Sequence, residues 1–204
     1  MTIPNLISKY QKQVTVSRLK KIYSVLNNVV KLSEIDNGPK STWEFPQGYA
    51  PQNEVIVFLN KYLVPYTNSA TLYTREQMND MNYSFTNLTS SCSFYGREAV
   101  IFSDGTIVSV FSNINNGYIW LYADINGLKK PNKVGHDVFV LDLLSTIADE
   151  TINSGNYVKF WSDIPSGTSY SCTKENTSMY AGWACGDMIQ KNGWKIPDDY
   201  PIKF

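Results

Sequence analysis

The residues from 124 to 137 bring together side chains whose oxygen atoms could bind a cation. Asp124, Asn126 and Asp137 carry the carboxylate and amide oxygens that a hard cation such as Ca²⁺ prefers, and Gly127 permits a sharp bend between them. The spacing lacks the alternating ligands and the final Glu of an EF-hand loop. An Asx-Gly pair is also a turn former, because an Asx side chain hydrogen-bonds its own backbone. The sequence therefore favours a structural turn here over a calcium site.

Three cysteines offer one disulfide and one free thiol. Cys92, Cys172 and Cys185 are too few for a disulfide-stabilised scaffold, although a single bridge would suit an exported protein. A bridge between Cys172 and Cys185 would close a short loop and stabilise the fold by roughly 3 kcal/mol. A bridge from Cys92 to one of the other two, or three reduced thiols in a cytosolic protein, are the alternatives that the sequence leaves open.

The sequence has no residue pattern typical of a catalytic centre. Cys92 as a nucleophile would need a base, and His136 is the single histidine. Neighbouring side chains in a strand point to opposite faces, so His136 and Asp137 would not share a site, and a surface or turn histidine is favoured. A Gly-rich phosphate loop, a Cys or His metal array and a Gly-x-Ser-x-Gly turn are also missing. We therefore predict that the protein is not an enzyme and needs no cofactor.

Aromatic residues are a second source of binding chemistry, because their flat rings can stack on the bases of DNA or on a glycan. The candidates are Trp120, Tyr122, Trp161, Tyr170, Trp183 and Trp194. Strands and helices usually bury such side chains, so we expect most of them in the core.

Charge is unevenly distributed in a chain whose net formal charge is zero. Residues 1–33 carry six basic side chains and no acidic one, so the other residues have a net charge of −6. A basic N-terminal segment could be attracted to anionic lipid or to the acidic body of a neighbouring subunit. A solvated helix face rich in lysine is the simpler interpretation.

The elements that position these residues begin with one long helix, from Ile3 to about Ile35. Apolar residues recur at steps of three and four, Pro4 lies in the first turn where proline is tolerated, and Gly38 with Pro39 ends the pattern. A helix of about 32 residues would be roughly 48 Å long, which exceeds the diameter of a compact body of this chain length. We therefore expect residues 1–15 to project as a stalk while the rest of the helix packs on the body.

The remaining residues predict an α+β fold in a single domain, 1–204. A region of helix and loop covers residues 36–95, an antiparallel meander covers 96–143, and a C-terminal region covers 144–204. Its predicted strands are 98–103, 106–112, 117–124 and 137–143, with a two-residue type I′ turn at Asp104-Gly105. Its predicted shorter helices are 53–62 and 178–191, and residues 67–91 are predicted as loop with one helical turn near 75–81. The long helix should cover one face of this four-stranded, mostly antiparallel sheet.

Three motifs together resemble those of type IV pilins and type II secretion pseudopilins, over most of the chain. Residues 2–10, with Pro4, look like the stretch that follows the membrane segment in that family. The second motif is Asp124-Ile125-Asn126-Gly127 with Pro131-Asn132, Gly135, Asp137 and Phe139. The third is Cys172, Trp183-Ala184-Cys185, Asn192-Gly193-Trp194-Lys195-Ile196 and Asp199-Tyr200-Pro201.

The resemblance implies a pilin-like fold and a non-catalytic subunit of a type IV pilus or type II secretion pseudopilus on the bacterial surface. Its partners would be other pilin subunits, and a hydrophobic half-helix preceding the given residues would hold it in the inner membrane before assembly. Filaments of this kind serve adhesion, motility, DNA uptake or secretion.

The resemblance also bears on individual residues. It implies a bridge between Cys172 and Cys185 that pins the C-terminal region to the body. It implies calcium in the loop from Asp124 to Asp137, as in some pseudopilins. The alternative function is a minor pilin at the filament tip, whose aromatic loops would bind DNA, a glycan or a protein ligand.

Overall fold

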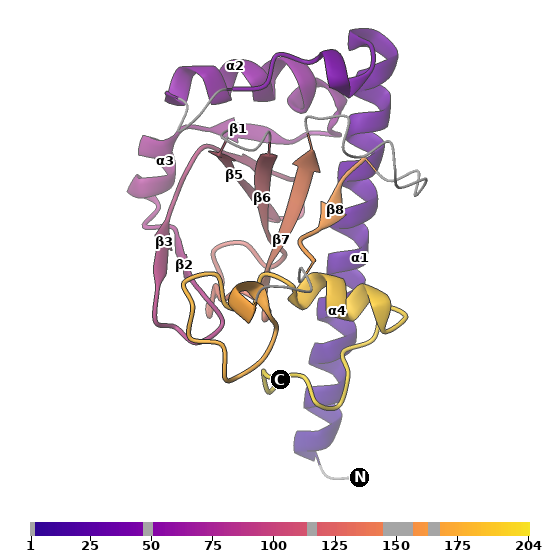
Figure 1. Ribbon diagram of the computed structural model, residues 1–204, viewed down its shortest axis with the longest axis vertical. Coiled ribbons are helices and arrows are strands. Elements are labelled where there is room, and N and C mark those ends of the chain that lie inside the picture. The colour runs from indigo at the N-terminus through magenta and orange to yellow at the C-terminus, as the bar shows by residue number, and fades with distance from the viewer. Residues whose placement is uncertain (1–2, 47–50, 114–117, 145–156, 163–167) are drawn as a thin grey trace.

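The dominant element is one unbroken helix, α1 (Ile3–Asn37). The computed structural model describes residues 3–46, 51–113, 118–144, 157–162 and 168–204. Helix α1 runs along the length of the molecule and extends past the body at its N-terminal end (Figure 1). The predicted long helix is therefore confirmed, two residues longer at its C-terminal end than expected.

The main sheet has six strands in the order β1-β4-β5-β6-β7-β8, and every neighbouring pair is antiparallel. The strands are β1 (Thr71–Tyr73), β4 (Ala99–Ile101), β5 (Ile107–Asn113), β6 (Tyr118–Asp124), β7 (Val138–Leu144) and β8 (Lys159–Phe160). The four predicted strands correspond to β4 to β7. The prediction of a four-stranded sheet was wrong, because one short strand is added at each edge. Runs of two or three residues are too short to show an alternating pattern.

The region predicted as loop also contains regular structure. Helix α3 (Arg75–Asp80) begins at a capping box formed by Thr74 and Gln77, which confirms the predicted helical turn. Strands β2 (Ser84–Thr86) and β3 (Ser93–Tyr95) then pair in a small antiparallel sheet of their own. The prediction of loop was wrong for β1 and β2, which are strands of three residues each within a stretch rich in Asn, Ser and Thr.

The other helices are short. Helix α2 (Gln52–Tyr62) agrees with the prediction, whereas α4 (Cys185–Lys191) is half as long as predicted. Gly182 has a φ of +90°, a conformation that a helix cannot contain, so the chain turns before α4 begins. The described residues also include the 3₁₀ helices η1 (Lys40–Thr42), η2 (Val64–Tyr66) and η5 (Thr168–Tyr170).

The turn between β4 and β5 is not the type I′ turn that the sequence suggested. A type I′ turn needs left-handed backbone at both central residues, and here only Gly105 has a positive φ, of +85°. Gly105 N donates to Phe102 O at 2.9 Å, and Phe102 N donates to Thr106 O at 2.9 Å. This is a type I turn followed by a glycine bulge, the usual three-residue hairpin connection.

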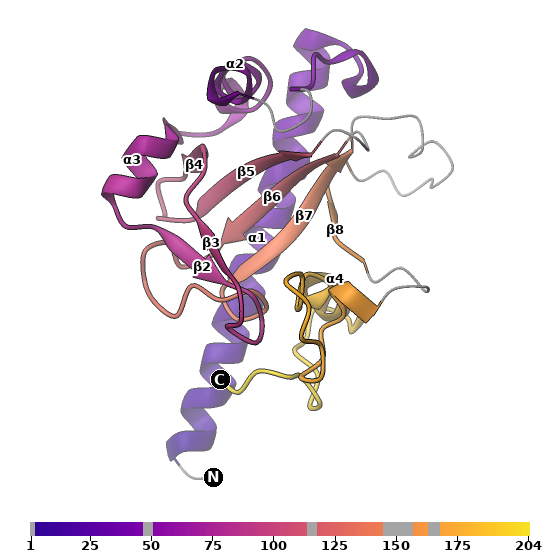
Figure 2. The same ribbon diagram turned by 60° about the vertical axis from the view of Figure 1, so that its left-hand side comes forward.

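The two faces of the sheet are covered by different elements. Alternate residues of β6, such as Ile119 and Leu121, pack with Leu19 and Leu26 of α1 in one core cluster. The intervening residues, such as Tyr122, pack with α3, with β2 and β3, and with the C-terminal region in a second cluster. Helix α1 accordingly passes behind the central strands in Figure 2. Each fully buried Leu or Ile on α1 contributes roughly 1.5–3 kcal/mol to this packing.

Candidate functional site

The N-terminal part of α1 is a projecting stalk. No residue from Ile3 onward is buried until Thr15. Large apolar side chains nevertheless lie in this part: Ile3 is 76% exposed, Leu6 58%, Ile7 51% and Tyr10 66%. Residues 3–14 of the predicted stalk, 1–15, therefore present apolar surface to water, whereas Thr15 already packs on the body.

The exposed apolar side chains lie on a different face of α1 from the buried ones. We define the stalk stripe as the exposed residues Ile3, Leu6, Ile7 and Tyr10, with the half-buried Val14 at the end next to the body. The buried residues of α1 are Thr15, Leu19, Ile22, Tyr23, Leu26, Val29, Val30 and Ser33. At about 100° per residue, the centres of these two stripes differ by roughly 140° around the helix. The stalk stripe therefore continues away from the body rather than along the core.

The sequence already signals that the apolar side chains change from one face of α1 to another. The prediction of a single helical pattern overlooked this signal. The apolar pattern advances from Val14 to Val16, a step of two residues. Such a step turns roughly 200° around a helix, whereas steps of three or four keep to one face. The sequence therefore already encodes two apolar stripes on different faces of the helix.

The loop from Asp124 to Asp137 is organised by hydrogen bonds to its carboxylates. Asp124 is fully buried, and its Oδ1 accepts hydrogen bonds from Asn126 N at 3.2 Å and Gly127 N at 2.9 Å. Tyr83 donates its hydroxyl to Asp124 Oδ2 at 3.1 Å. Burial, and then the negative charge of Asp137, raise the pKa of Asp124 to about 8, against the lowering effect of these hydrogen bonds.

Both carboxylate oxygens of Asp137 also accept hydrogen bonds. Its Oδ2 accepts from Asn126 Nδ2 and from Asn132 N, both at 3.0 Å, and its Oδ1 accepts from Lys133 N at 2.5 Å. All four oxygens of Asp124 and Asp137 thus face N–H or O–H donors, which is the arrangement of a structural turn. Within the described residues, no group of three His, Cys, Asp or Glu could hold a metal ion. Calcium binding by Asp124, Asn126 and Asp137 stays a prediction that this geometry does not favour.

His136 lies in a turn, as the sequence favoured, but its side chain is closer to Asp137 than expected. It precedes β7 in a turn, and its Nδ1 is 3.7 Å from Asp137 Oδ2. The prediction that the two side chains point apart was wrong, because alternation of faces applies only inside a strand. The imidazole ring also stacks on Phe204, with ring centroids 4.8 Å apart. These contacts tie the C-terminal residues to the loop.

The disulfide pairing left open by the sequence joins Cys172 to Cys185, with their Cα atoms 4.9 Å apart. Both cysteines are buried, whereas Cys92 is a half-buried free thiol. The bridge links the segment before α4 to its first residue.

The aromatic residues considered as a ligand surface lie mainly inside the protein. Trp183, Tyr122 and Trp161 are buried, and the other three are half-buried. The rings of Trp120 and Trp183 meet edge to face at 4.9 Å, and Trp194 packs on Tyr23. These six side chains therefore belong to the core or its margin, as expected, and do not form an open recognition surface.

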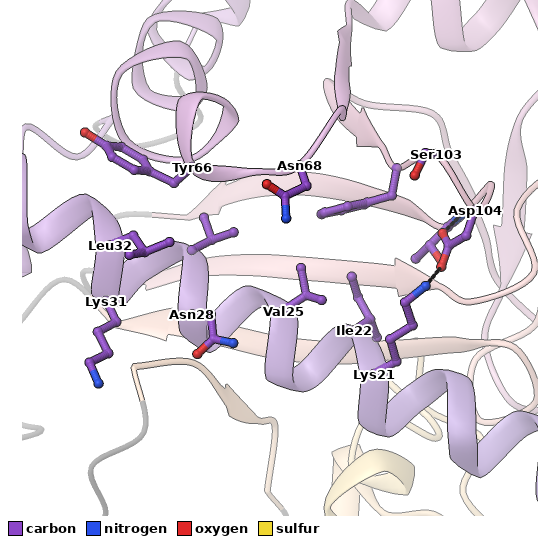
Figure 3. A pocket seen from close by; sticks show the side chains of 13 residues that line it. Lys21, Ile22, Val25, Asn28, Lys31, Leu32, Tyr66, Asn68, Ser103 and Asp104 are labelled. Atoms are coloured by element: carbon purple, nitrogen blue, oxygen red, sulfur yellow. Dashed lines mark hydrogen bonds and ion pairs between the residues drawn. The ribbon is translucent and has the colours of Figure 1, made fainter.

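A groove that the sequence analysis missed lies between α1, the segment after η2, and the β4–β5 turn (Figure 3). It has a volume of about 520 Å³, and Ile22, Val25 and Leu32 supply much of its apolar lining. Lys21 reaches across to Asp104 and forms an ion pair of 2.7 Å at one end. Only the tertiary arrangement brings these segments together, so no local pattern predicts the groove.

The acidic group of this groove already has partners. Burial alone would raise the pKa of Asp104, but the hydrogen bonds from Lys21 Nζ and Thr106 N lower it to about 2. Asp104 is therefore ionised at neutral pH, and its function in the structure is to pin the β4–β5 turn to α1.

Comparison with known proteins gives one family and no further relatives. The sequence profile of a family described as "Family of unknown function (DUF6613)" matches residues 5–204. No curated protein and no solved structure matches the chain. In the part of the chain that the structure describes, no helix combines the length and apolar character needed to cross a membrane.

Proposed function

The chain belongs to the DUF6613 family, whose function is unknown, and we propose that it is a structural subunit of a pilin-like filament. In this proposal α1 is the element that joins subunits, and the sheet with its loops forms the outer surface of the filament. The assembly would be a type IV pilus or a type II secretion pseudopilus on the bacterial surface. The protein would have no catalytic step of its own.

The observation that carries the proposal is the stalk stripe. Contiguous apolar side chains exposed on a soluble surface mark an interaction site. Those of the stalk stripe recur at the spacing with which one helix packs on another. Folding of the body does not account for most of the stripe, because only Tyr10 and Val14 border the body and Tyr10 is still 66% exposed. A neighbouring helix in an assembly would bury it.

The distribution of charge supports contact between copies of the chain. The basic residues Lys9 and Lys12 lie on the stalk, and the residues after 33 have a net charge of −6. A stalk that packs beside the bodies of neighbouring subunits would place opposite charges together, which favours specific assembly. A contact of stalk on body joins unlike surfaces, and such contacts build open filaments when the rotation does not close a ring.

The proposal includes a membrane-held stage. A further apolar segment continuing α1 at its N-terminal end would hold the subunit in the inner membrane before assembly. The direction of α1 is compatible with this, because its N-terminal end points away from the body (Figure 1).

Filament assembly can be tested in cells that make the protein from its natural gene. Immunogold electron microscopy with antibodies to the body should show labelled filaments. The double variant Leu6→Asp/Tyr10→Asp should abolish them, because it places charge in the stalk stripe, where the two side chains are 58% and 66% exposed. The purified variant should keep the wild-type melting temperature.

The matched control is Val57→Asp/Tyr95→Asp, which changes two apolar residues that are 63% and 74% exposed on the body. It should leave filaments intact. Wild-type cells without labelled filaments, or equal loss of filaments in both variants, would refute the proposal.

A further inference from the structure

A second hollow lies where the stalk leaves the body. It has a volume of about 390 Å³, and one side is formed by α1 from Tyr10 to Arg18. The other side is formed by the loop that precedes β7, together with the stacked rings of His136 and Phe204. The site thus joins three segments that are distant in sequence.

The charge in this hollow is mainly positive. Arg18, Lys129 and Lys130 line it, and within the described residues none of the three forms an ion pair. The acidic residue in the lining is Asp137, whose two oxygens already accept three hydrogen bonds from N–H groups. Three cations without an ion-pair partner lie beside one carboxylate that is already hydrogen-bonded. This excess of positive charge favours an anionic ligand.

The kinds of cation present suit a phosphate group. A guanidinium presents several N–H donors in a plane that matches phosphate oxygens, and lysine adds mobile point charge. Arg18 Nη1 donates to Ile125 O at 3.3 Å, which holds the guanidinium beside the loop. Its other N–H groups remain for a ligand, with Lys129 and Lys130 on the opposite side of the hollow.

An apolar hollow adjoins the basic one. It is lined by Leu6, Ile7, Lys9, Tyr10 and Gln13, and Tyr10 lines both hollows. A ligand that fits the two together carries an anionic group next to a hydrocarbon chain. A phospholipid has this form, whereas free phosphate would use the basic part alone.

We propose that the junction of stalk and body binds the phosphate group of an anionic phospholipid, with its acyl region against the stalk. The site would hold the body at the surface of the membrane leaflet next to the stalk. This inference goes beyond subunit assembly and does not depend on it, because a single copy of the chain contains every residue involved.

Vesicle co-sedimentation of the purified chain tests the inference. Vesicles of one part phosphatidylglycerol to two parts phosphatidylcholine should bind the chain at low salt, and vesicles of phosphatidylcholine alone should bind it at least tenfold more weakly. Lys129→Gln/Lys130→Gln should weaken binding to the anionic vesicles at least tenfold, since each cation near such a surface contributes about fivefold.

The control Lys31→Gln/Lys61→Gln removes the same net charge from exposed lysines near the far end of α1 and on α2. It should change vesicle binding less than threefold, and both variants should melt like the wild type. Equal weakening by the two double variants would overturn the proposal, because binding would then follow net charge alone.

Competition separates a lipid headgroup from free phosphate. Excess inorganic phosphate should displace the chain from anionic vesicles no better than sodium chloride at equal ionic strength. Displacement by phosphate at concentrations where the salt has no effect would overturn the assignment to lipid and identify free phosphate as the ligand. Absence of any preference for anionic vesicles would overturn the site itself.

Discussion

Asp142 lies on β7 opposite Trp120 of β6, on the sheet face that packs against the C-terminal region. Its Oδ1 is buried and has no hydrogen-bond partner among the described residues. Burial raises the pKa of Asp142 to about 8. Together with Asp124, whose pKa is also about 8, the described residues include two carboxyl groups that hold their protons at neutral pH.

These two carboxyl groups should make stability decrease as pH rises. In the unfolded chain they lose their protons near pH 4, so between about pH 4 and pH 8 the folded state binds more protons than the unfolded state. Their contribution is fully present below about pH 4 and is lost as pH rises through about 8. Urea unfolding should give a free energy that falls by a few kcal/mol between about pH 5 and pH 9.

Asp142→Asn isolates one of the two groups, because asparagine has the shape of the protonated acid but cannot ionise. The free energy of unfolding of the variant should decrease less between about pH 5 and pH 9 than that of the wild type. The variant should be more stable than the wild type above about pH 8. Asp198→Asn, at an exposed position, is the matched control and should leave the profile unchanged. If the free energy of unfolding of the wild type rises with pH across this range, the raised pKa values of the two carboxyl groups are contradicted.

At the scale of elements, the sequence correctly predicted the helix and strands whose apolar pattern repeats over many residues. Helix α1 and strands β5 to β7 have long apolar patterns and were found at nearly their full lengths. Strands β1 and β8 were missed because they are edge strands of three and two residues whose pairing partners define them. The start of α4 was misplaced because the left-handed backbone of Gly182 depends on its tertiary surroundings.

Site residues, like the elements, were predicted only where the signal lies in a short stretch of sequence. The disulfide cysteines and the turn formed by Asp124 and Asn126 were identified as candidates because those residue types carry local signals. The hollow between Arg18 and Lys130 was missed, because its walls come from segments more than a hundred residues apart. Local sequence patterns do not show which distant segments contact one another in the fold.

The disulfide should stabilise the C-terminal region measurably. Cys172 and Cys185 are 13 residues apart, and a loop of this length corresponds to roughly 3 kcal/mol in the chain-entropy account. Cys172→Ala/Cys185→Ala should therefore lower the free energy of unfolding by about this amount in denaturant titrations. Cys92→Ser is the control and should change it by less than about 0.5 kcal/mol. Equal stability of the double variant and the wild type would show that the bridge does not constrain the fold.

At the scale of the whole molecule, α1 carries two apolar stripes on different faces, and in the proposed filament each stripe would have its own function. From Thr15 onward its buried face holds the sheet, while the stalk stripe before it is available to another molecule. The body can therefore fold as a single copy, and assembly can use a surface that folding does not require. This separation is what the account of a filament subunit depends on.

The most direct test is cross-linking through the stalk stripe in cells that make the protein from its natural gene. Leu6→Cys/Tyr10→Cys in a Cys92→Ser background places two thiols on exposed positions of the stripe. Mild oxidation should produce a ladder of dimers, trimers and longer species on non-reducing gels, because the stripe of each stalk would pack on the stripes of two neighbouring stalks, while its basic side chains face the bodies. The same background with Val57→Cys/Tyr95→Cys should stay mainly monomeric. A stalk variant that also stays monomeric would contradict the central claim.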